Sequence, residues 1–242
     1  LLDSDIIKQS LSRMLRHPFL FARNALCKLI IDPLKYATKE GYNARKYWGD
    51  RLGQYGRSFR GVGHEGLSED ENKSQYREAG EKVVRLINEH GLDLGEATVL
   101  DIGVGTGFYT ELMKEHGVQD YTGVDITNAL FPNLRSRFPG YTFKRADITS
   151  DPIQGAYDII LMIDVVEHIV TEEDLGAAMR TVGSALTPQG LFLISGLTDR
   201  TGRLLFYTHA WSADDVAGHF PGSEIRGPFP FRDNKILALH KA

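Results

Sequence analysis

The sequence of 242 residues predicts an α/β protein: a doubly wound, seven-stranded, mostly parallel sheet with a C-terminal antiparallel hairpin, plus an N-terminal helical arm and lid. Two observations carry this prediction. From about residue 76 onwards, short apolar runs typical of buried strands alternate with stretches of helical periodicity. The first of these runs ends in a turn with three glycines, after which a helix begins.

The glycine turn lies in residues 98–107, Thr-Val-Leu-Asp-Ile-Gly-Val-Gly-Thr-Gly, and residues 108–116 follow as a predicted helix. A backbone without side chains can approach a ligand closely, and a helix N-terminus offers free N–H groups. A dinucleotide fingerprint would need its third glycine where Phe108 stands. Asp101, two residues before the first glycine, would repel a pyrophosphate but suits a ligand that carries an ammonium group.

This Asp-x-Gly-x-Gly-x-Gly pattern resembles the first motif of the class I S-adenosylmethionine-dependent methyltransferases, and the chain is most similar to small-molecule O-methyltransferases. The resemblance extends over residues 76–242, with four motifs in order. It implies S-adenosylmethionine as cofactor, S-adenosylhomocysteine as product, and in-line transfer of the methyl group to a small molecule, above all to a hydroxyl oxygen. It also implies a set of cofactor-binding residues: Asp101, Gly103, Gly105, Gly107, Asp125, Ile126, Asp147, Ile148 and Asp164.

The spacing of two later aspartates agrees with the resemblance. Asp125 ends a predicted strand, 121–125, and lies 24 residues after Asp101. This is close to the offset of about 20 residues at which a Rossmann-like second strand presents its acidic end. A carboxylate there can accept hydrogen bonds from both ribose hydroxyls. Ala-Asp-Ile at 146–148 ends the next predicted strand and resembles the adenine-binding corner of the family.

The other predicted core elements follow the expected alternation. A helix over 75–90 precedes the first strand, and Pro132 opens the helix after the second. A strand over 157–164, whose composition indicates burial on both faces, is followed by a helix with an N-terminal signature at Thr171. A strand over 191–195 comes next, and the closing hairpin is predicted from two last segments, 223–228 and 235–240.

The first part of residues 1–75, which we predict as an arm and lid separate from the core, is basic. Residues 1–35 carry six basic and three acidic side chains in two amphipathic stretches, punctuated by Pro18 and Pro33. We expect two helices that pack on the domain or on a second copy of the chain. The alternative is that residues 1–37 contact a membrane surface or a partner.

The second part, residues 41–75, combines aromatic side chains with many glycines, which argues against long regular elements. Long loops in compact domains are often lids, and in small-molecule methyltransferases the segment before the core commonly covers the cofactor. We therefore expect a lid here, with a surface loop held by aromatic contacts as the alternative.

Candidate catalytic residues follow the fourth and fifth predicted strands, because ligands of such sheets bind at the carboxyl ends of the strands. His168 and His209 are the candidate general bases, since histidine is the usual base near neutral pH. Asp164, at the end of the fourth strand, completes the catalytic set. If neither histidine acts, the next candidates are three lid residues: Tyr42, Tyr47 and Asp50.

The run Asp164-x-x-Glu167-His168 has a second interpretation. It is similar to the Glu-x-x-Glu-His pattern with which the ubiquinone-pathway O-methyltransferases and the small-RNA 2′-O-methyltransferases help to hold a divalent ion. Here the first residue is Asp, one methylene shorter, so a metal is not favoured and we assign no metal ligand. A catalytic base, a structural pair at the pocket floor and a metal site all stay open.

Composition and missing motifs narrow the partners. A net charge of −4 and the lack of a basic stripe interleaved with aromatics in the core argue against a nucleic-acid partner. The single cysteine, Cys27, excludes the cytosine C5 enzymes and suggests a reducing cytoplasm. No apolar run approaches the length of a membrane span, and a homo-oligomer stays open. The alternatives to an enzyme of this class are a non-catalytic S-adenosylmethionine- or nucleotide-binding module within a complex, and a nicotinamide-dependent reductase.

Overall fold

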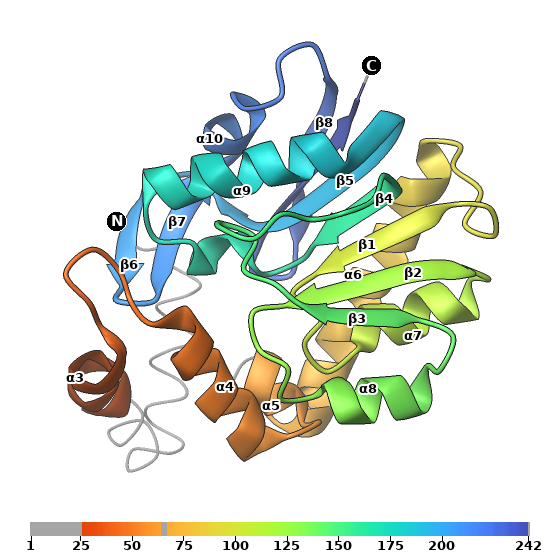
Figure 1. Ribbon diagram of the computed structural model, residues 1–242. Coiled ribbons are helices and arrows are strands. Elements are labelled where there is room, and N and C mark those ends of the chain that lie inside the picture. The colour runs from red at the N-terminus through yellow and green to blue at the C-terminus, as the bar shows by residue number, and fades with distance from the viewer. Residues whose placement is uncertain (1–25, 64–66, 242) are drawn as a thin grey trace.

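The computed structural model describes residues 26–63 and 67–241, and it shows a central sheet with helices on both faces (Figure 1). The strands are β1 (Thr98–Ile102), β2 (Asp120–Asp125), β3 (Thr142–Arg145), β4 (Tyr157–Met162), β5 (Leu186–Thr198), β6 (Gly202–Leu205), β7 (Thr208–Ser212), β8 (Glu224–Phe231) and β9 (Asn234–His240). The helices are η1 (Cys27–Ile31), α3 (Asp32–Tyr36), α4 (Ala44–Tyr55), α5 (Phe59–Val62), α6 (Glu69–Glu89), α7 (Phe108–Glu115), α8 (Phe131–Arg137), η2 (Val166–His168), α9 (Glu172–Ala185) and α10 (Ala213–Ala217).

The sheet has the mostly parallel order that the sequence predicts. Strands β3, β2, β1, β4 and β5 lie side by side in parallel, β9 joins β5 in antiparallel register, and β8 joins β9 as the closing hairpin. These are the seven expected strands. A second hairpin, β6–β7, was not predicted. It extends the sheet from the far end of β5, where Leu197 and Thr198 pair with Trp211 and Ser212.

Neighbouring residues of the central strands point to opposite faces of the sheet, and both faces are covered, which is why large apolar side chains predominate in β1, β4 and β5. Val99 and Leu193 face the cluster that includes α6, α7 and α8. Leu100 and Ile194 face the cluster that includes α9 and α10. The doubly wound arrangement therefore buries both faces and leaves the carboxyl ends of the strands as the place for a site.

Local capping sets where the core helices begin. The Ser68 side chain accepts a hydrogen bond from the backbone N–H of Glu71, whose carboxylate accepts one from Ser68 in return. This capping box starts α6 at Glu69, six residues before the predicted start at 75. At α9 the sequence signature is correct, because the Thr171 side chain accepts from the backbone N–H of Asp174.

The segment before the core is more regular than its glycines suggest. It forms α4, capped by the Asn43 side chain, and the short α5. Gly49 lies inside α4, and a Cβ on it would come 3.5 Å from the Thr127 hydroxyl, so the helix runs close to the core there. The glycine-based expectation of a loop was wrong at α4, since asparagine capping and burial of Tyr47 and Leu52 outweigh the low helix propensity of glycine.

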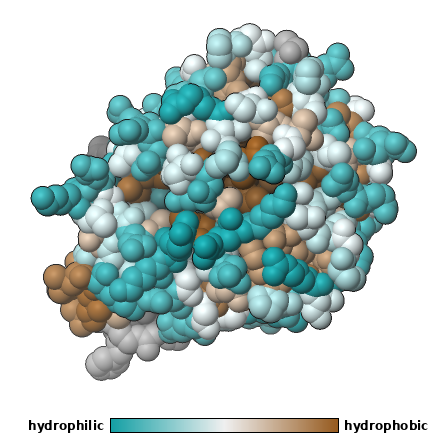
Figure 2. Space-filling model, viewed as in Figure 1, coloured by the Kyte–Doolittle hydropathy of each residue, from teal (hydrophilic) through white to brown (hydrophobic). Residues whose placement is uncertain are grey.

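The described part of the arm is exposed and apolar. Its first predicted helix lies outside the described residues, whereas residues from Cys27 to Tyr36 form η1 and α3. Leu29, Ile30 and Leu34 are exposed here, Leu34 by 85%, and this is the brown patch at the lower left of Figure 2, where α3 lies in Figure 1. Over residues 26–63 and 67–241, no helix combines the length and hydropathy of a membrane span.

Candidate active site

A cavity of about 930 Å³ lies where the glycine turn, the carboxyl ends of β2 and β4, and the lid segment meet. Its size is at the upper end of the range for ligand pockets, about 300–1,000 Å³. Lid side chains on its wall include Tyr42, Trp48 and Val62. The predicted lid over 41–75 therefore contributes to the cavity, through α4, α5 and the turn before them.

The glycine turn presents bare backbone to this cavity. Gly103 and Gly105 line it, both with positive φ, and a Cβ on Gly105 would lie 3.1 Å from a methyl of Val62. Gly107 does not line it. A Cβ at Gly107 would lie 2.4 Å from a methyl of Leu134, so this glycine is required by packing between the turn and α8. The three glycines thus divide into two that face the cavity and one that lets the turn fit the core.

Asp125 is buried at the end of β2 and lines the cavity beside Ile126. One carboxylate oxygen accepts from the backbone N–H of Gly105 at 3.0 Å, and the other from that of Thr127 at 3.1 Å. Burial raises the pKa of this carboxyl to about 6, although these N–H donors act in the opposite direction. The carboxylate is therefore joined directly to the glycine turn.

Asp101, the acidic residue of the first motif, is buried behind the turn and does not line the cavity. The Tyr121 hydroxyl donates to its carboxylate at 2.6 Å. Burial raises the pKa of Asp101 to about 7, Tyr121 opposes the rise, and the charge of Asp125 adds to it. In this position Asp101 supports the glycine turn from behind. Its carboxylate does not reach the cavity, so it is not placed to contact an ammonium group of a ligand directly.

Asp147 and Ile148 line another part of the cavity, as the resemblance implies. The Asp147 carboxylate accepts from the backbone N–H and the hydroxyl of Thr149, at 3.1 and 2.7 Å. This local turn fixes the aspartate while Ile148 stays buried and apolar. The pair can offer an acceptor and an apolar flank to a planar ring.

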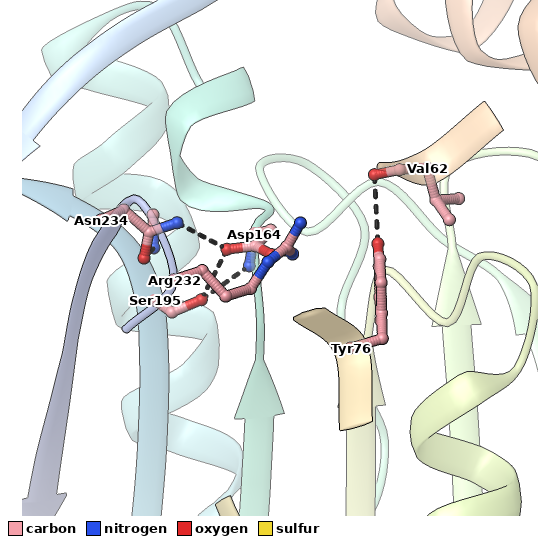
Figure 3. Close-up of polar contacts among 7 residues, drawn as sticks. Val62, Tyr76, Asp164, Ser195, Arg232 and Asn234 are labelled. Atoms are coloured by element: carbon pink, nitrogen blue, oxygen red, sulfur yellow. Dashed lines mark hydrogen bonds and ion pairs between the residues drawn. The ribbon is translucent and has the colours of Figure 1, made fainter. Parts of the chain in front are cut away.

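Asp164 also lines the cavity, but its carboxylate is committed to protein partners (Figure 3). Ser195 and Asn234 donate to one carboxylate oxygen at 2.9 and 3.0 Å, and Arg232 forms an ion pair with the other. The residue has φ +55°, a left-handed conformation that is uncommon outside glycine. Asp164 is therefore held in place as a fixed carboxylate, and this arrangement does not suit proton transfer.

His168 follows on η2 and lines the cavity. Its Nδ1 lies 3.1 Å from the carbonyl oxygen of Tyr207, and because a carbonyl only accepts, Nδ1 carries a proton. Burial lowers the pKa of His168 to about 4, so the ring is neutral at pH 7. The described residues provide no hydrogen-bond partner for Nε2, and its lone pair is the remaining acceptor of the ring.

The lid holds the backbone and the ring of His168. The Tyr42 hydroxyl donates to the His168 carbonyl oxygen at 3.3 Å and accepts from Trp48 Nε1 at 3.2 Å. The Trp48 ring packs edge-on to the imidazole, with 4.7 Å between centroids, and the Tyr207 ring stacks on it at 5.9 Å. Tyr42 is thus occupied by two hydrogen bonds, and burial raises its pKa, so it is a support for His168 and a poor base.

Three other sequence candidates lie away from the cavity wall. His209, on β7, stacks on Trp211 at 3.9 Å, and its buried Nδ1 has no partner among the described residues. Tyr47 is buried in the aromatic cluster with Tyr36 and Tyr207. The Asp50 carboxylate accepts from Lys35 and Tyr36 at 2.8 and 2.9 Å on the exposed side of the lid.

The Asp-x-x-Glu-His run does not form a ligand set for a metal. Within the described part of the chain no three side chains of His, Cys, Asp or Glu are grouped to hold an ion. Asp164 is paired with Arg232, and His168 Nδ1 is bonded to Tyr207. Glu167 is buried against Gly196, where an added Cβ would lie 2.0 Å from its carboxyl, and burial raises its pKa well above the ordinary range. These residues do not fit a divalent cation.

Sequence reasoning missed the residues that orient the candidates. The Tyr207 carbonyl and the Trp48 ring orient His168, and Arg232 fixes Asp164. The role of Tyr207 was indicated in the sequence, because residues 206–211 contain several aromatic side chains next to His209. No signal in one sequence pairs Arg232 with an aspartate 68 residues away.

The cavity fits S-adenosylmethionine by its chemistry. The backbone at Gly103 and Gly105 leaves room that a Cβ would fill, Asp125 offers a buried carboxylate for hydroxyl groups, and Asp147–Ile148 suit a planar base. Asp164 adds a fixed carboxylate next to these features. The combination matches a ligand with a ribose and a purine.

Comparisons with known proteins agree. A family model described as a methyltransferase domain matches residues 72–226. Malonyl-[acyl-carrier protein] O-methyltransferase of Serratia marcescens is 28% identical over 155 residues, 62% of this chain and 57% of that protein. A dTDP-3-amino-3,4,6-trideoxy-alpha-D-glucopyranose N,N-dimethyltransferase of Streptomyces venezuelae is 27% identical over 100 residues, 40% of this chain and 41% of that protein. The chain thus spans about half the length of these two relatives, and 2% and 6% of two matching synthases.

The fold also matches solved structures. The crystal structure of magnesium protoporphyrin IX methyltransferase (ChlM) from Synechocystis PCC 6803 with bound SAH superposes with a TM-score of 0.65 at 18% identity, covering 82% of this chain and 98% of that one. Sheet order, glycine turn and family match together define a class I S-adenosylmethionine-dependent methyltransferase. The chain belongs to the methyltransferase domain family, and the two structures of magnesium protoporphyrin IX methyltransferase that share its fold hold S-adenosylhomocysteine and S-adenosylmethionine.

Proposed function

We propose that the chain methylates a hydroxyl oxygen of a small-molecule acceptor, with His168 as the general base. One observation carries this proposal. The Nδ1–H of a cavity-lining histidine is committed to the Tyr207 carbonyl, which leaves the Nε2 lone pair as the proton acceptor of the ring. A hydroxyl nucleophile needs such an acceptor, because its proton must leave as the oxygen attacks.

S-adenosylmethionine, when bound, supplies a methyl group on a positively charged sulfur, and the acceptor oxygen bonds to that carbon as the carbon–sulfur bond breaks. His168 Nε2 takes the hydroxyl proton. Since burial holds the pKa of His168 at about 4, the ring enters the reaction neutral, and the imidazolium readily releases its proton to water afterwards. Asp125 and Asp147 hold and orient the cofactor, which supplies the proximity on which an in-line displacement depends.

The lid contributes to the same chemistry. Tyr42 and Trp48 support His168 and line the cavity, so an acceptor that reaches Nε2 lies against aromatic side chains. We divide the chain accordingly into an arm and lid, residues 1–75, and a methyltransferase core, residues 76–242. Helix α6 crosses that boundary at its first turns. A lid that closes over the site also excludes water from the sulfonium.

The proposal is tested with purified protein, S-adenosylmethionine and a panel of acceptors in which each hydroxyl compound has a matched amine. Accumulation of S-adenosylhomocysteine with the hydroxyl members, lost in His168→Ala, is the expected result. Turnover of the amines alone would overturn the hydroxyl assignment. Binding of S-adenosylhomocysteine without turnover of the panel or of a metabolite extract would favour the second candidate, a non-catalytic binding module.

The proposal places the protein in the cytoplasm, in line with the single cysteine Cys27, and gives the arm a docking role. The exposed side chains of Leu29, Ile30 and Leu34 support contact with a membrane surface or with a second copy of the chain. Removal of residues 1–37 should leave the affinity for S-adenosylhomocysteine unchanged while it alters liposome co-sedimentation or oligomer size. Unchanged behaviour in both assays would reduce the arm to a packing element.

A further inference from the structure

We propose that Arg232, in the turn between β8 and β9, is a positioning residue for the cofactor site. It is not among the residues that line the cavity. On one side, Arg232 forms an ion pair with Asp164. On the other side, it packs on the ring of Tyr76, whose hydroxyl is bonded to Val62 in the lid. The inference deepens the proposed function and rests on it only for the identity of the cofactor.

The first side of this link is the ion pair with Asp164 (Figure 3). The side chain of Arg232 is 7% exposed and that of Asp164 15%, so the pair is largely out of water. Both residues have positive φ, +53° and +55°. This backbone conformation is energetically unfavourable for residues other than glycine, and it is found where contacts with the surroundings stabilise it. At Asp164 these contacts are the ion pair and the hydrogen bonds from Ser195 and Asn234.

The second side of the link leads to the lid. The guanidinium carbon of Arg232 lies 4.6 Å from the ring centroid of Tyr76 on α6. The Tyr76 hydroxyl donates to the carbonyl oxygen of Val62 at 3.2 Å, as the dashed line in Figure 3 shows. A methyl of Val62 lies 3.1 Å from the place of a Cβ on Gly105. One arginine therefore connects the C-terminal hairpin with both walls of the cavity.

The polar groups around Arg232 are not fully matched. Arg232 Nε, the Tyr109 hydroxyl and Glu167 Oε2 are buried without a partner among the described residues. Tyr109 lines the cavity, and the charge of Arg232 acts on both Tyr109 and Glu167. Buried polar groups are normally bonded, and a buried ion pair adds little net stability. An incompletely matched pair at a cavity wall therefore serves the ligand site more than it serves the fold.

The test compares three variants in the full chain by calorimetry with S-adenosylhomocysteine and no acceptor. Arg232→Met should raise the dissociation constant about tenfold, a common size for coupling between separate positions. Arg232→Lys keeps the charge and should recover part of the affinity. The matched control is Arg226→Met in the same hairpin, an exposed residue paired with Glu224, which should leave the constant unchanged. In turnover, Arg232→Met should raise the KM for S-adenosylmethionine more than it lowers kcat.

A lower melting temperature for Arg232→Met with unchanged affinity and KM would make the pair purely structural and overturn the inference. If that variant does not fold, Tyr76→Phe decides, because it keeps the ring beneath Arg232 and removes the hydroxyl that is bonded to Val62. It should weaken binding of S-adenosylhomocysteine about threefold, in the range of a lost neutral hydrogen bond, and unchanged binding would overturn the lid side of the link. Since calorimetry uses no acceptor, absence of turnover on every acceptor would count against the proposed function alone.

Discussion

Nδ1 of His168 lies 3.1 Å from the carbonyl oxygen of Tyr207, although 39 residues separate the two in the sequence. Tyr207 belongs to the turn between β6 and β7, the hairpin that the sequence does not predict. That hairpin therefore supplies the group that sets the tautomer of the candidate base. The same turn packs its aromatic side chains on the lid, at Tyr42 and Tyr47, so lid and base are oriented by one element.

The first prediction concerns the two candidate histidines. His168→Ala should lower kcat by about 10²–10⁴-fold at saturating S-adenosylmethionine, because it removes proton transfer. The dissociation constant of S-adenosylhomocysteine should change little. His209→Ala should keep kcat, since the ring stacks on Trp211 away from the cavity wall. Steady-state kinetics and calorimetry measure these effects.

The exposed residue His219 gives the matched control for both substitutions, and thermal melting checks that each variant is folded. A loss of kcat in His209→Ala with a normal melting temperature, and full activity in His168→Ala, would reverse the assignment. The base would then be sought on β7.

The second prediction is the pH dependence of cofactor binding. Burial raises the pKa of Asp125 to about 6, so the carboxyl gains a proton as the pH falls below that value. A protonated carboxyl cannot accept hydrogen bonds from both ribose hydroxyls, and binding should therefore weaken at low pH. Calorimetry with S-adenosylhomocysteine between pH 5 and 7.5 should show affinity rising with pH through about 6, by at most about tenfold per unit for one proton.

Asp125→Asn is the control for this titration, because the amide has a similar shape and no proton to lose in this range. Its affinity should be lower than that of the wild type at pH 7.5 and level across the same pH range. A wild-type affinity that is itself level between pH 5 and 7.5 would show that no titration of Asp125 is linked to cofactor binding in this range.

The third prediction tests the glycine turn. Gly105→Val should abolish measurable binding of S-adenosylhomocysteine, because its Cβ alone would come 3.1 Å from the Val62 methyl and φ is +48°. Gly140→Val is a suitable control, since nothing lies within 4 Å of the Cβ that it would add. Normal binding by Gly105→Val in calorimetry would refute the placement of the cofactor over this turn.

The sequence was sufficient for features that local rules decide. The strand, turn and helix around Gly103–Gly107, the Thr171 cap and the closing hairpin all follow from patterns of a few residues. The start of α6 was missed because Ser68 and Glu71 lie in a stretch assigned to the lid, although their capping box is a local signal. The sequence contained the information needed to place the start of α6, but the glycines of the lid were given more weight than the capping box.

The site shows what one sequence does not contain. Whether Asp164 acts as a free carboxylate depends on Arg232, and the tautomer of His168 depends on a backbone carbonyl at Tyr207. Both partners are brought in by strand register and by the turns of separate hairpins. Side-chain types and spacing near the motif are the same with or without these contacts. Roles assigned from a motif therefore needed the fold before a fixed carboxylate could be told from a base.

The last prediction concerns Asp101 and the stability of the fold. Burial raises its pKa from 3.8 to about 7 in the folded chain, with Tyr121 opposing the rise and Asp125 adding to it. Between these values the folded state holds a proton that the unfolded state has lost. The contribution of Asp101 to the free energy of unfolding is therefore largest below pH 4. It decreases as the pH rises to about 7 and is constant above that value.

Asp101→Asn removes this proton and keeps an oxygen that can accept from the Tyr121 hydroxyl. The wild type should therefore lose stability relative to Asp101→Asn between pH 4.5 and 8, by up to about 4 kcal/mol for three units of pKa. Urea unfolding at several pH values without cofactor measures the difference. Other groups cancel in it because both proteins carry them, and Asp120→Asn, an exposed substitution at the start of β2, should show no such trend. A difference between wild type and Asp101→Asn that does not vary with pH would mean that Asp101 is ionised throughout, held as an anion behind the glycine turn.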